Sequence, residues 1–174
     1  MKEYVIVTDS SCDIAREIAE SWGITVIDLE VNIEGIGTKY NSEIDAKEFY
    51  SYLRDKRSAK TSAANMDRFY GVFEKEICAG KDVIYLGFSS GLSATYSAGK
   101  NAALEIMENY PDSKVIAVDT LCAAFGQGLL VKLAVDKKNE GASIEELAEY
   151  RGDKHAPITA DDLKKILGGE LPPL

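Results

Sequence analysis

The sequence predicts an α/β fold, a three-layer α/β/α domain built on a parallel sheet. Short apolar runs with the length of buried strands alternate with longer segments whose apolar residues have helical spacing. The alternation continues along most of the 174 residues, a length typical of a single domain. Strands that alternate with helices in this way usually form a parallel sheet covered on both faces.

Each predicted strand is a short, continuous apolar run rich in β-branched residues. In chain order these strands cover Tyr4–Val7, Ile24–Val31, Val83–Phe88 and Val115–Val118. The second strand leads into a turn marked by Gly35 and Gly37. Unbroken apolar runs are typical of strands that are buried on both faces, so they support the parallel sheet.

Each predicted helix has apolar residues three or four positions apart, and several have a recognisable end signal. Gly23 and Gly80 are expected to end the first and third helices, and Asp45 is expected to cap the second. In chain order the helices cover Asp13–Trp22, Ala46–Leu53, Met66–Ala79, a long segment containing Ala98, Ala102 and Ile106, and Leu121–Asp136.

The predicted domain division is a lobe over residues 1–150 and a short C-terminal appendage over residues 151–174. After Glu149 the chain becomes polar and irregular, and a short amphipathic segment follows at Thr159–Leu167. The chain then ends in Gly168-Gly169 and a proline-rich sequence. This part is too short for a domain of its own, so we expect it to be docked or frayed.

Charge and cysteine content exclude several classes of function. The net charge of −9 argues against nucleic-acid and anionic-membrane surfaces, and the basic run Arg54–Arg57 is short and interrupted by an acid. No apolar stretch approaches the ~20 residues of a membrane span. The three cysteines are far apart, which predicts neither a disulfide framework nor structural zinc. With no secretory signal visible, we expect a cytoplasmic protein.

Polar residues follow directly after three of the predicted strands. They are Asp9-Ser10-Ser11, Ser89-Ser90 and Asp119-Thr120. The carboxyl ends of parallel strands meet at one sheet edge, where ligands bind in open α/β sheets. Hydroxyls and free backbone N–H groups at a helix start can hold an oxyanion. The segment Leu86–Tyr96 contains such donors but no obvious base or metal ligand, so we expect it to hold an acid rather than to break a bond.

These motifs together resemble the DegV family, whose characterised members bind fatty acids and include the FakB subunits of bacterial fatty-acid kinase. The likeness extends over residues 3–150, which are similar to the family's N-terminal lobe. Four segments carry it, in the family's order: Thr8-Asp9-Ser10 (the opening TDS), Thr61-Ser62 (the TSQPS-like loop), Ser89–Tyr96 (the SSGLSGTY signature), and Asp119-Thr120 with Gly126-Gln127-Gly128 (the DS…GxG segment).

The resemblance implies a carrier that binds a long-chain fatty acid and presents its carboxylate to a separate ATP-dependent kinase subunit. By the same likeness, Thr61 and Ser93 hold the carboxylate, while Ser62, Ser90 and Gly91 shape the pocket. Asp9, Ser10, Ser89 and Asp119 are expected at the pocket edge. No cofactor, metal or catalytic residue of the chain's own is implied.

The sequence departs from the family pattern in two places. Ala63-Ala64-Asn65 stands where the family has Gln-Pro-Ser. Family members continue into a second lobe that closes over the lipid, and residues 151–174 resemble only the start of that lobe. Within that part Glu170 stands where an arginine is expected. The resemblance therefore covers the first lobe only.

Each candidate residue also has a purely structural interpretation. Thr61 and Ser93 could cap a helix or form a turn. Asp9 and Asp119 could act as bases or bind magnesium, but we favour bracing of strand-to-helix turns. His155 is the only histidine and lies in the irregular tail, without a nucleophile elbow for a serine hydrolase.

Two further features have structural explanations that we prefer. Cys12 and Cys122 could have lowered thiol pKa values at helix starts, although small buried side chains are the simpler reading. Gly126-Gln127-Gly128 lacks the third glycine of a dinucleotide motif and fits close helix packing instead.

Three hypotheses of function remain after this comparison. The first is fatty-acid binding. The second is binding or conversion of a phosphorylated small molecule, because the same donors suit phosphate. The third is a truncated, non-binding remnant that self-associates through its uncovered apolar face.

Overall fold

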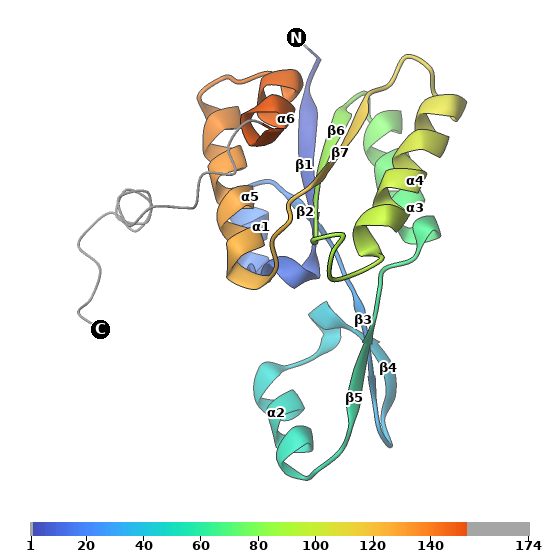
Figure 1. Ribbon diagram of the computed structural model, residues 1–174, viewed down its shortest axis with the longest axis vertical. Helices are drawn as coiled ribbons and strands as arrows, with labels where there is room; N and C mark the ends of the chain where they lie inside the picture. Colours follow the sequence, from blue (N-terminus) through green and yellow to red (C-terminus); the bar gives the residue numbers. More distant parts are fainter. Residues whose placement is uncertain (1, 153–174) are drawn as a thin grey trace, which may run out of the picture.

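A four-stranded parallel sheet forms the centre of the fold. The computed structural model describes residues 2–152 of the chain (Figure 1). The strands are β1 (Tyr4–Asp9), β2 (Thr25–Ile27), β6 (Asp82–Gly87) and β7 (Val115–Asp119), in the spatial order β2-β1-β6-β7. The central strands β1 and β6 are buried along their whole length. This confirms the predicted parallel sheet.

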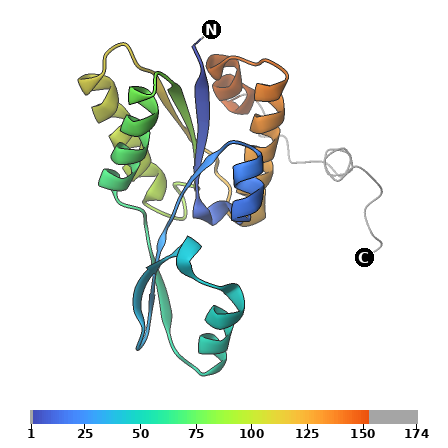
Figure 2. The same ribbon diagram turned by 180° about the vertical axis from the view of Figure 1, so that it is seen from behind.

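Helices cover both faces of this sheet, which completes the three layers (Figure 2). The period-two alternation of a strand sends Val5 and Val7 of β1 to one face and Tyr4 and Ile6 to the other. Two helices pack on the Val5 face: α3 (Met66–Cys78) and α4 (Thr95–Asn109). Three pack on the Tyr4 face: α1 (Arg16–Ser21), α5 (Ala124–Asn139) and α6 (Ile144–Gly152).

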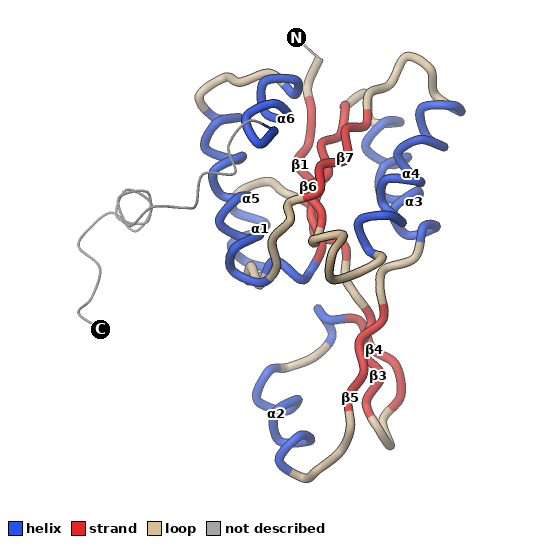
Figure 3. The backbone as a smooth tube through the Cα atoms, in the orientation of Figure 1, coloured by secondary structure: helices blue, strands red, loops and turns tan. Residues whose placement is uncertain are grey.

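A second, antiparallel sheet lies beyond the carboxyl ends of the parallel strands (Figure 3). Its strands are β3 (Glu30–Ile33), β4 (Gly37–Tyr40) and β5 (Ala59–Ser62), in the order β4-β3-β5. A short 3₁₀ turn, η2 (Asn41–Glu43), and the helix α2 (Ala46–Arg54) connect β4 to β5. The sequence predicts only one sheet, the parallel one, so this small sheet is an addition to the predicted architecture.

The predicted strand Ile24–Val31 is wrong as a single element. The chain pairs with β1 only as far as Ile27, and from Glu30 onward it pairs with β4 and β5 instead. Hydrogen bonds hold the connection between the two parts. Leu29 N donates to Ser10 Oγ at 2.9 Å, and the Asp28 carboxylate accepts from Ser42 N at 3.0 Å. Tertiary contacts therefore divide an apolar run that has no local break.

The ends of several elements match their predicted signals. Asp45 Oδ1 accepts from Glu48 N at 2.9 Å and caps α2 as expected. Gly23 and Gly80 have φ values of +64° and +82°, which suit glycine after a helix. The first helix begins at Arg16 rather than Asp13, because the chain first forms the 3₁₀ turn η1 (Ser10–Cys12).

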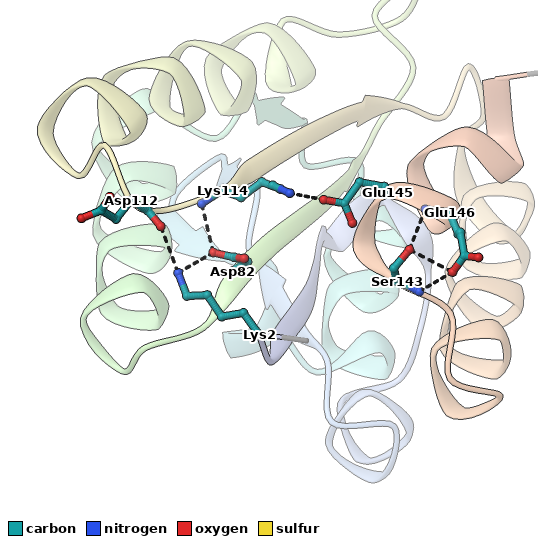
Figure 4. A network of polar contacts seen from close by, with 7 residues as sticks. All are labelled: Lys2, Asp82, Asp112, Lys114, Ser143, Glu145 and Glu146. Atoms are coloured by element: carbon teal, nitrogen blue, oxygen red, sulfur yellow. Dashed lines mark hydrogen bonds and ion pairs between the residues drawn. The ribbon is translucent and has the colours of Figure 1, made fainter.

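Helix α6 was not among the predicted elements. Ser143 Oγ accepts from Glu146 N at 3.2 Å, and the Glu146 carboxylate accepts from Ser143 N at 2.8 Å (Figure 4). This reciprocal capping box is a sequence signal for the start of a helix. The predicted appendage lies almost entirely in residues 153–174, outside the described residues, as do His155 and Thr159–Leu167.

Ion pairs close the amino-end edge of the parallel sheet (Figure 4). The buried Asp82 carboxylate accepts from Lys2 Nζ at 2.7 Å and from Lys114 N at 3.0 Å. Lys114 Nζ also pairs with Glu145 of α6. A shallow depression of about 310 Å³ lies at the same edge, lined by Lys2, Ile77 and residues 109–113. None of the predicted site residues lines it.

Candidate functional site

The strand order places a topological switch point at the carboxyl ends of β1 and β6. From β1 the chain crosses to β2 on one side, and β6 and β7 follow on the other side. The helices α1 and α4, which follow β1 and β6, cover opposite faces of the sheet. Segments leaving two adjacent strands toward opposite faces open a crevice at the strand ends, which is where ligands bind in this class of sheet.

Asp9, the last residue of β1, is fully buried at this switch point and is surrounded by donors. Its Oδ2 atom accepts from Tyr85 Oη at 2.7 Å and from Phe88 N at 2.9 Å, and its Oδ1 atom accepts from Ser11 N at 3.2 Å. Burial and the adjacent Asp9 charge raise the pKa of Tyr85, so Tyr85 stays a neutral donor. Asp9 therefore braces the turns that follow β1 and β6.

Gln127 of α5 extends this buried network across the sheet edge. Its Nε2 donates to Thr8 Oγ1 at 3.1 Å and to Asp9 Oδ1 at 3.3 Å, while its Oε1 accepts from Ser11 Oγ at 2.8 Å. The next residue is Gly128, where an added Cβ would lie 2.5 Å from the backbone oxygen of Cys12. The predicted close packing at Gly126-Gln127-Gly128 is confirmed at Gly128.

The loop between β6 and α4 holds most of the hydroxyls of the predicted site. Ser89 is buried, Ser90 and Gly91 are exposed, and Ser93 is half-buried. Ser93 Oγ accepts from Thr95 N at 3.1 Å and lies 2.9 Å from Thr95 Oγ1. Ser93 thus supports the start of α4, a role compatible with donating its hydroxyl proton to a ligand.

The backbone N–H groups of this loop were expected to be free, and that expectation is wrong. Gly91 N donates to Ser89 Oγ at 3.3 Å, and Ser93 N donates to Ser89 O at 3.1 Å. Ser90 N donates to Asp119 Oδ1 at 3.2 Å. The donors left for a ligand are therefore mainly the Ser90 and Ser93 hydroxyls.

The loop between β7 and α5 lies against the β6–α4 loop. Ser89 N donates to Cys122 O at 3.0 Å, and Thr120 Oγ1 donates to Gly87 O at 2.6 Å. Leu121 and Ala124 have φ values of +50° and +51°, a left-handed conformation that is strained for non-glycine residues. The contacts with the neighbouring loop hold this segment in place. The three polar steps after β1, β6 and β7 thus meet at one edge, as predicted.

Thr61 and Ser62 lie apart from that cluster, on β5 of the small sheet. In register, Thr61 is opposite Val31 and Ser62 is opposite Glu30, so the two hydroxyl side chains point to opposite faces. Both residues are exposed. Within residues 2–152, no hydrogen bond joins either of them to the Ser93 loop. The proximity of Thr61 and Ser93 at one carboxylate stays a prediction.

The same edge also presents apolar side chains to solvent. Leu92 of the β6–α4 loop is 68% exposed, and Leu121 and Phe125 of the β7–α5 segment are 54% and 71% exposed. The sequence pattern does not distinguish these residues, because exposed and core apolar positions look alike in it. Apolar side chains that flank polar donors are typical of a site for an amphipathic ligand.

The other candidate chemistries gain no support from the described residues. Burial raises the pKa of the Cys12 thiol to about 11, so Cys12 is the buried filler that we preferred. The described side chains, those of residues 2–149, include no group of three or more His, Cys, Asp or Glu that could hold a metal ion. No helix in that part of the chain is long and apolar enough to cross a membrane.

Comparison with known proteins identifies relatives of the chain. Residues 3–167 match the family described as "Uncharacterised protein, DegV family". The chain is 40% identical over 154 residues to the DegV domain-containing protein CPE0026 of Clostridium perfringens. That match covers 86% of the chain and 52% of the relative. The chain thus spans about half the length of this curated relative.

Solved structures with the same fold include proteins described as fatty-acid-binding. A stearic acid-binding protein from Eubacterium ventriosum matches with a TM-score of 0.79 and 27% identity, covering 86% of this chain and 52% of that one. A fatty-acid-binding DegV family protein from Thermus thermophilus matches with a TM-score of 0.76 and 28% identity, covering 87% and 52%. The family match and the fold agree: the chain belongs to the DegV family.

Proposed function

We propose that this chain binds a long-chain fatty acid at the carboxyl edge of its parallel sheet. The observation that carries the proposal is the conjunction of hydroxyl donors and exposed apolar side chains at the switch point. Ser90 and Ser93 offer hydroxyl protons, and Leu92, Leu121 and Phe125 are exposed on the same two loops. A carboxylate with a hydrocarbon tail matches both kinds of surface.

The chemistry of the site favours binding over bond breaking. Asp9 is fully buried and accepts from several donors, so it is not placed as a general base. Fatty-acid binding by the relatives from Eubacterium ventriosum and Thermus thermophilus supports the same role for this chain. Burying an acyl chain stabilises a complex by about 0.8 kcal/mol per CH₂ before the costs of association.

Three parts of this proposal go further than ligand binding. Presentation of the carboxylate to a separate kinase subunit stays a prediction, as do the cytoplasmic location and the carboxylate-binding roles of Thr61 and Ser93. Pull-down with a fatty-acid kinase subunit, with and without hexadecanoate, tests the partnership directly.

The binding proposal is tested by a pair of matched serine variants. Ser93 and Ser143 both accept a backbone N–H at the start of a helix, but they lie at opposite edges of the sheet. Each alanine variant should lose a similar stability, about 1 kcal/mol. Only Ser93→Ala should weaken hexadecanoate binding, by about tenfold or more, because a hydrogen bond to a charged group contributes about 1.5–3 kcal/mol.

Isothermal titration calorimetry with hexadecanoate measures this difference, after bound lipid has been extracted and identified by mass spectrometry. Thr61→Val, with Thr38→Val on the neighbouring strand β4 as its control, tests the second predicted contact in the same way. Equal affinities of the wild type, Ser93→Ala and Ser143→Ala would refute the assignment of the site.

The two other hypotheses predict different results. A site for a phosphorylated small molecule predicts that inorganic phosphate or a nucleotide raises the melting temperature while fatty acid does not. A self-associating remnant predicts a mass that rises with concentration and no response to any ligand. Sedimentation measured with and without hexadecanoate separates these outcomes from the proposed one.

A further inference from the structure

One buried donor in the described part of the chain has no acceptor. Among the buried side-chain nitrogen and oxygen atoms of residues 2–149, whose side chains the structure describes, Arg68 Nη1 is the one without a hydrogen-bond partner. The Arg68 side chain forms no ion pair there; its guanidinium stacks on the ring of Tyr40, with Cζ 3.9 Å from the ring centroid. Buried polar groups are nearly always satisfied, so this guanidinium calls for an acceptor.

The position of Arg68 relates it to the candidate site. In the register of the small sheet, Tyr40 is opposite Glu30 and Glu30 is opposite Ser62. Residues opposite each other in antiparallel strands share a face of the sheet. The guanidinium that covers Tyr40 therefore lies on the face that also carries the Ser62 hydroxyl.

Arg68 also lies on the same side of the molecule as the Ser93 loop. It belongs to the first turn of α3, where its backbone N donates to Asn65 Oδ1 at 3.0 Å. Helices α3 and α4 pack beside each other on one face of the sheet, and both begin at its carboxyl edge (Figure 1). The first turn of α4 follows Ser93 directly.

The charge of Arg68 fits what the site otherwise lacks. The nearby acidic groups Asp9 and Asp119 accept hydrogen bonds from the loops and would repel a carboxylate. A planar guanidinium binds a carboxylate with two parallel hydrogen bonds and is more weakly hydrated than an ammonium group. The Arg68 residue is half-buried as a whole while its Nη1 atom is covered, so a carboxylate reaches Nη1 only when the side chains that cover this atom move aside. Glu30 is on the same face, but no ion pair joins it to Arg68 among the described residues.

We propose that Arg68 binds the carboxylate of the fatty acid, with the Ser62 hydroxyl as a neighbouring donor; Thr61 points to the opposite face of β5 and does not contact the same carboxylate in this arrangement. This inference rests on the proposed function and adds to it the positive charge that selects an acid over an uncharged lipid. Stacking on Tyr40 holds the guanidinium in place before the ligand arrives. The ligand carboxylate supplies the acceptor that Nη1 lacks.

The test compares the affinities of hexadecanoate and of hexadecanol, which has the same tail without a charge, for three variants. Arg68→Gln should bind hexadecanoate about tenfold more weakly and hexadecanol as the wild type does. Arg68→Lys keeps the positive charge but not the planar guanidinium, so its affinity for hexadecanoate should lie between those of the wild type and Arg68→Gln. Arg16→Gln is the control, because Arg16 is an exposed arginine on α1 that pairs with Glu20.

The outcomes separate this inference from the proposed function. If Arg68→Gln matches the wild type for hexadecanoate while Ser93→Ala is impaired, the role of Arg68 is wrong and the binding site stands. An equal loss of acid and alcohol would make Arg68 structural and would also overturn the inference. Inorganic phosphate is the third probe. If Arg68→Gln abolishes the thermal stabilisation by phosphate but leaves hexadecanoate binding unchanged, Arg68 binds a free oxyanion and the inference is wrong. If the wild type binds no fatty acid, the proposed function itself fails.

Discussion

Replacing Gly128 with alanine should destabilise the protein, whereas the same replacement at Gly126 should not. Both glycines lie in the first turns of α5. An ideal Cβ on Gly128 would lie 2.5 Å from the backbone oxygen of Cys12 and 3.3 Å from Ile14 Cγ1. At Gly126 the nearest such atom is Cys122 Cβ, at an ordinary contact distance of 3.8 Å.

The magnitude follows from comparing the two variants. Alanine in a helix is favoured over glycine by about 0.8–1.0 kcal/mol, and this gain applies to both positions. Overpacking a tight contact costs about 1–3 kcal/mol, and it applies only to Gly128. A backbone carbonyl cannot rotate away as a side chain can, so the upper end of that range is expected. The free energy of unfolding of Gly128→Ala should therefore be about 2–3 kcal/mol lower than that of Gly126→Ala.

Urea unfolding followed by circular dichroism measures both free energies directly. A difference of this size should also separate the melting temperatures by roughly 4–12 °C for a chain of this length. The adjacent Gln127 is part of the Asp9 network, so Gly128→Ala should weaken ligand binding as well. If the two variants are equally stable, the close approach of α5 to η1 is not as described.

Three other predictions concern the buried network, acid stability and thiol reactivity. Tyr85→Phe removes a hydrogen-bond donor from the buried Asp9 carboxylate, so thermal unfolding should show a free energy of unfolding that is lower by about 1–3 kcal/mol. The Lys114 hydrogen bond lowers the pKa of Glu145 from 4.5, so its stabilisation is present above that pH and lost as the pH falls below it. In Glu145→Gln, the free energy of unfolding measured in urea should therefore fall less steeply as the pH is lowered than it does in the wild type. Iodoacetamide at pH 8 should label exposed Cys78 and spare Cys12, whose pKa is raised to about 11; rapid labelling of Cys12 would contradict its burial.

The parallel sheet and its helices could be predicted because local signals agree with tertiary structure there. Residues Val83–Leu86 form one apolar run and one fully buried strand, and Asp45 and Gly80 end helices as their chemistry requires. The start of helix α6 has an equally clear signal in the sequence, because the Ser143–Glu146 spacing is that of a capping box.

The small sheet could not be predicted in the same way. Strand β5 is short and polar, Ala59-Lys60-Thr61-Ser62, and its alternation is too weak to distinguish it from a loop. Its pairing with β3 depends on a chain reversal through α2 that no local pattern specifies. Likewise, sequence order placed Asp9, Ser89 and Asp119 at one edge, but it could not show that the loop N–H groups are already bonded.

The edge position of β5 has a consequence for how a ligand would be released. Within the described residues, β5 pairs only with β3, so its outer row of backbone groups gains nothing from a neighbouring strand. Such a strand can detach in a local opening that leaves the central sheet intact and needs less free energy than global unfolding. Because Thr61 and Ser62 are on this strand, the rate at which β5 opens would set an upper limit on how long a ligand stays bound there. Amide hydrogen exchange of the N–H groups bonded to β3 measures this rate under conditions in which every opening leads to exchange.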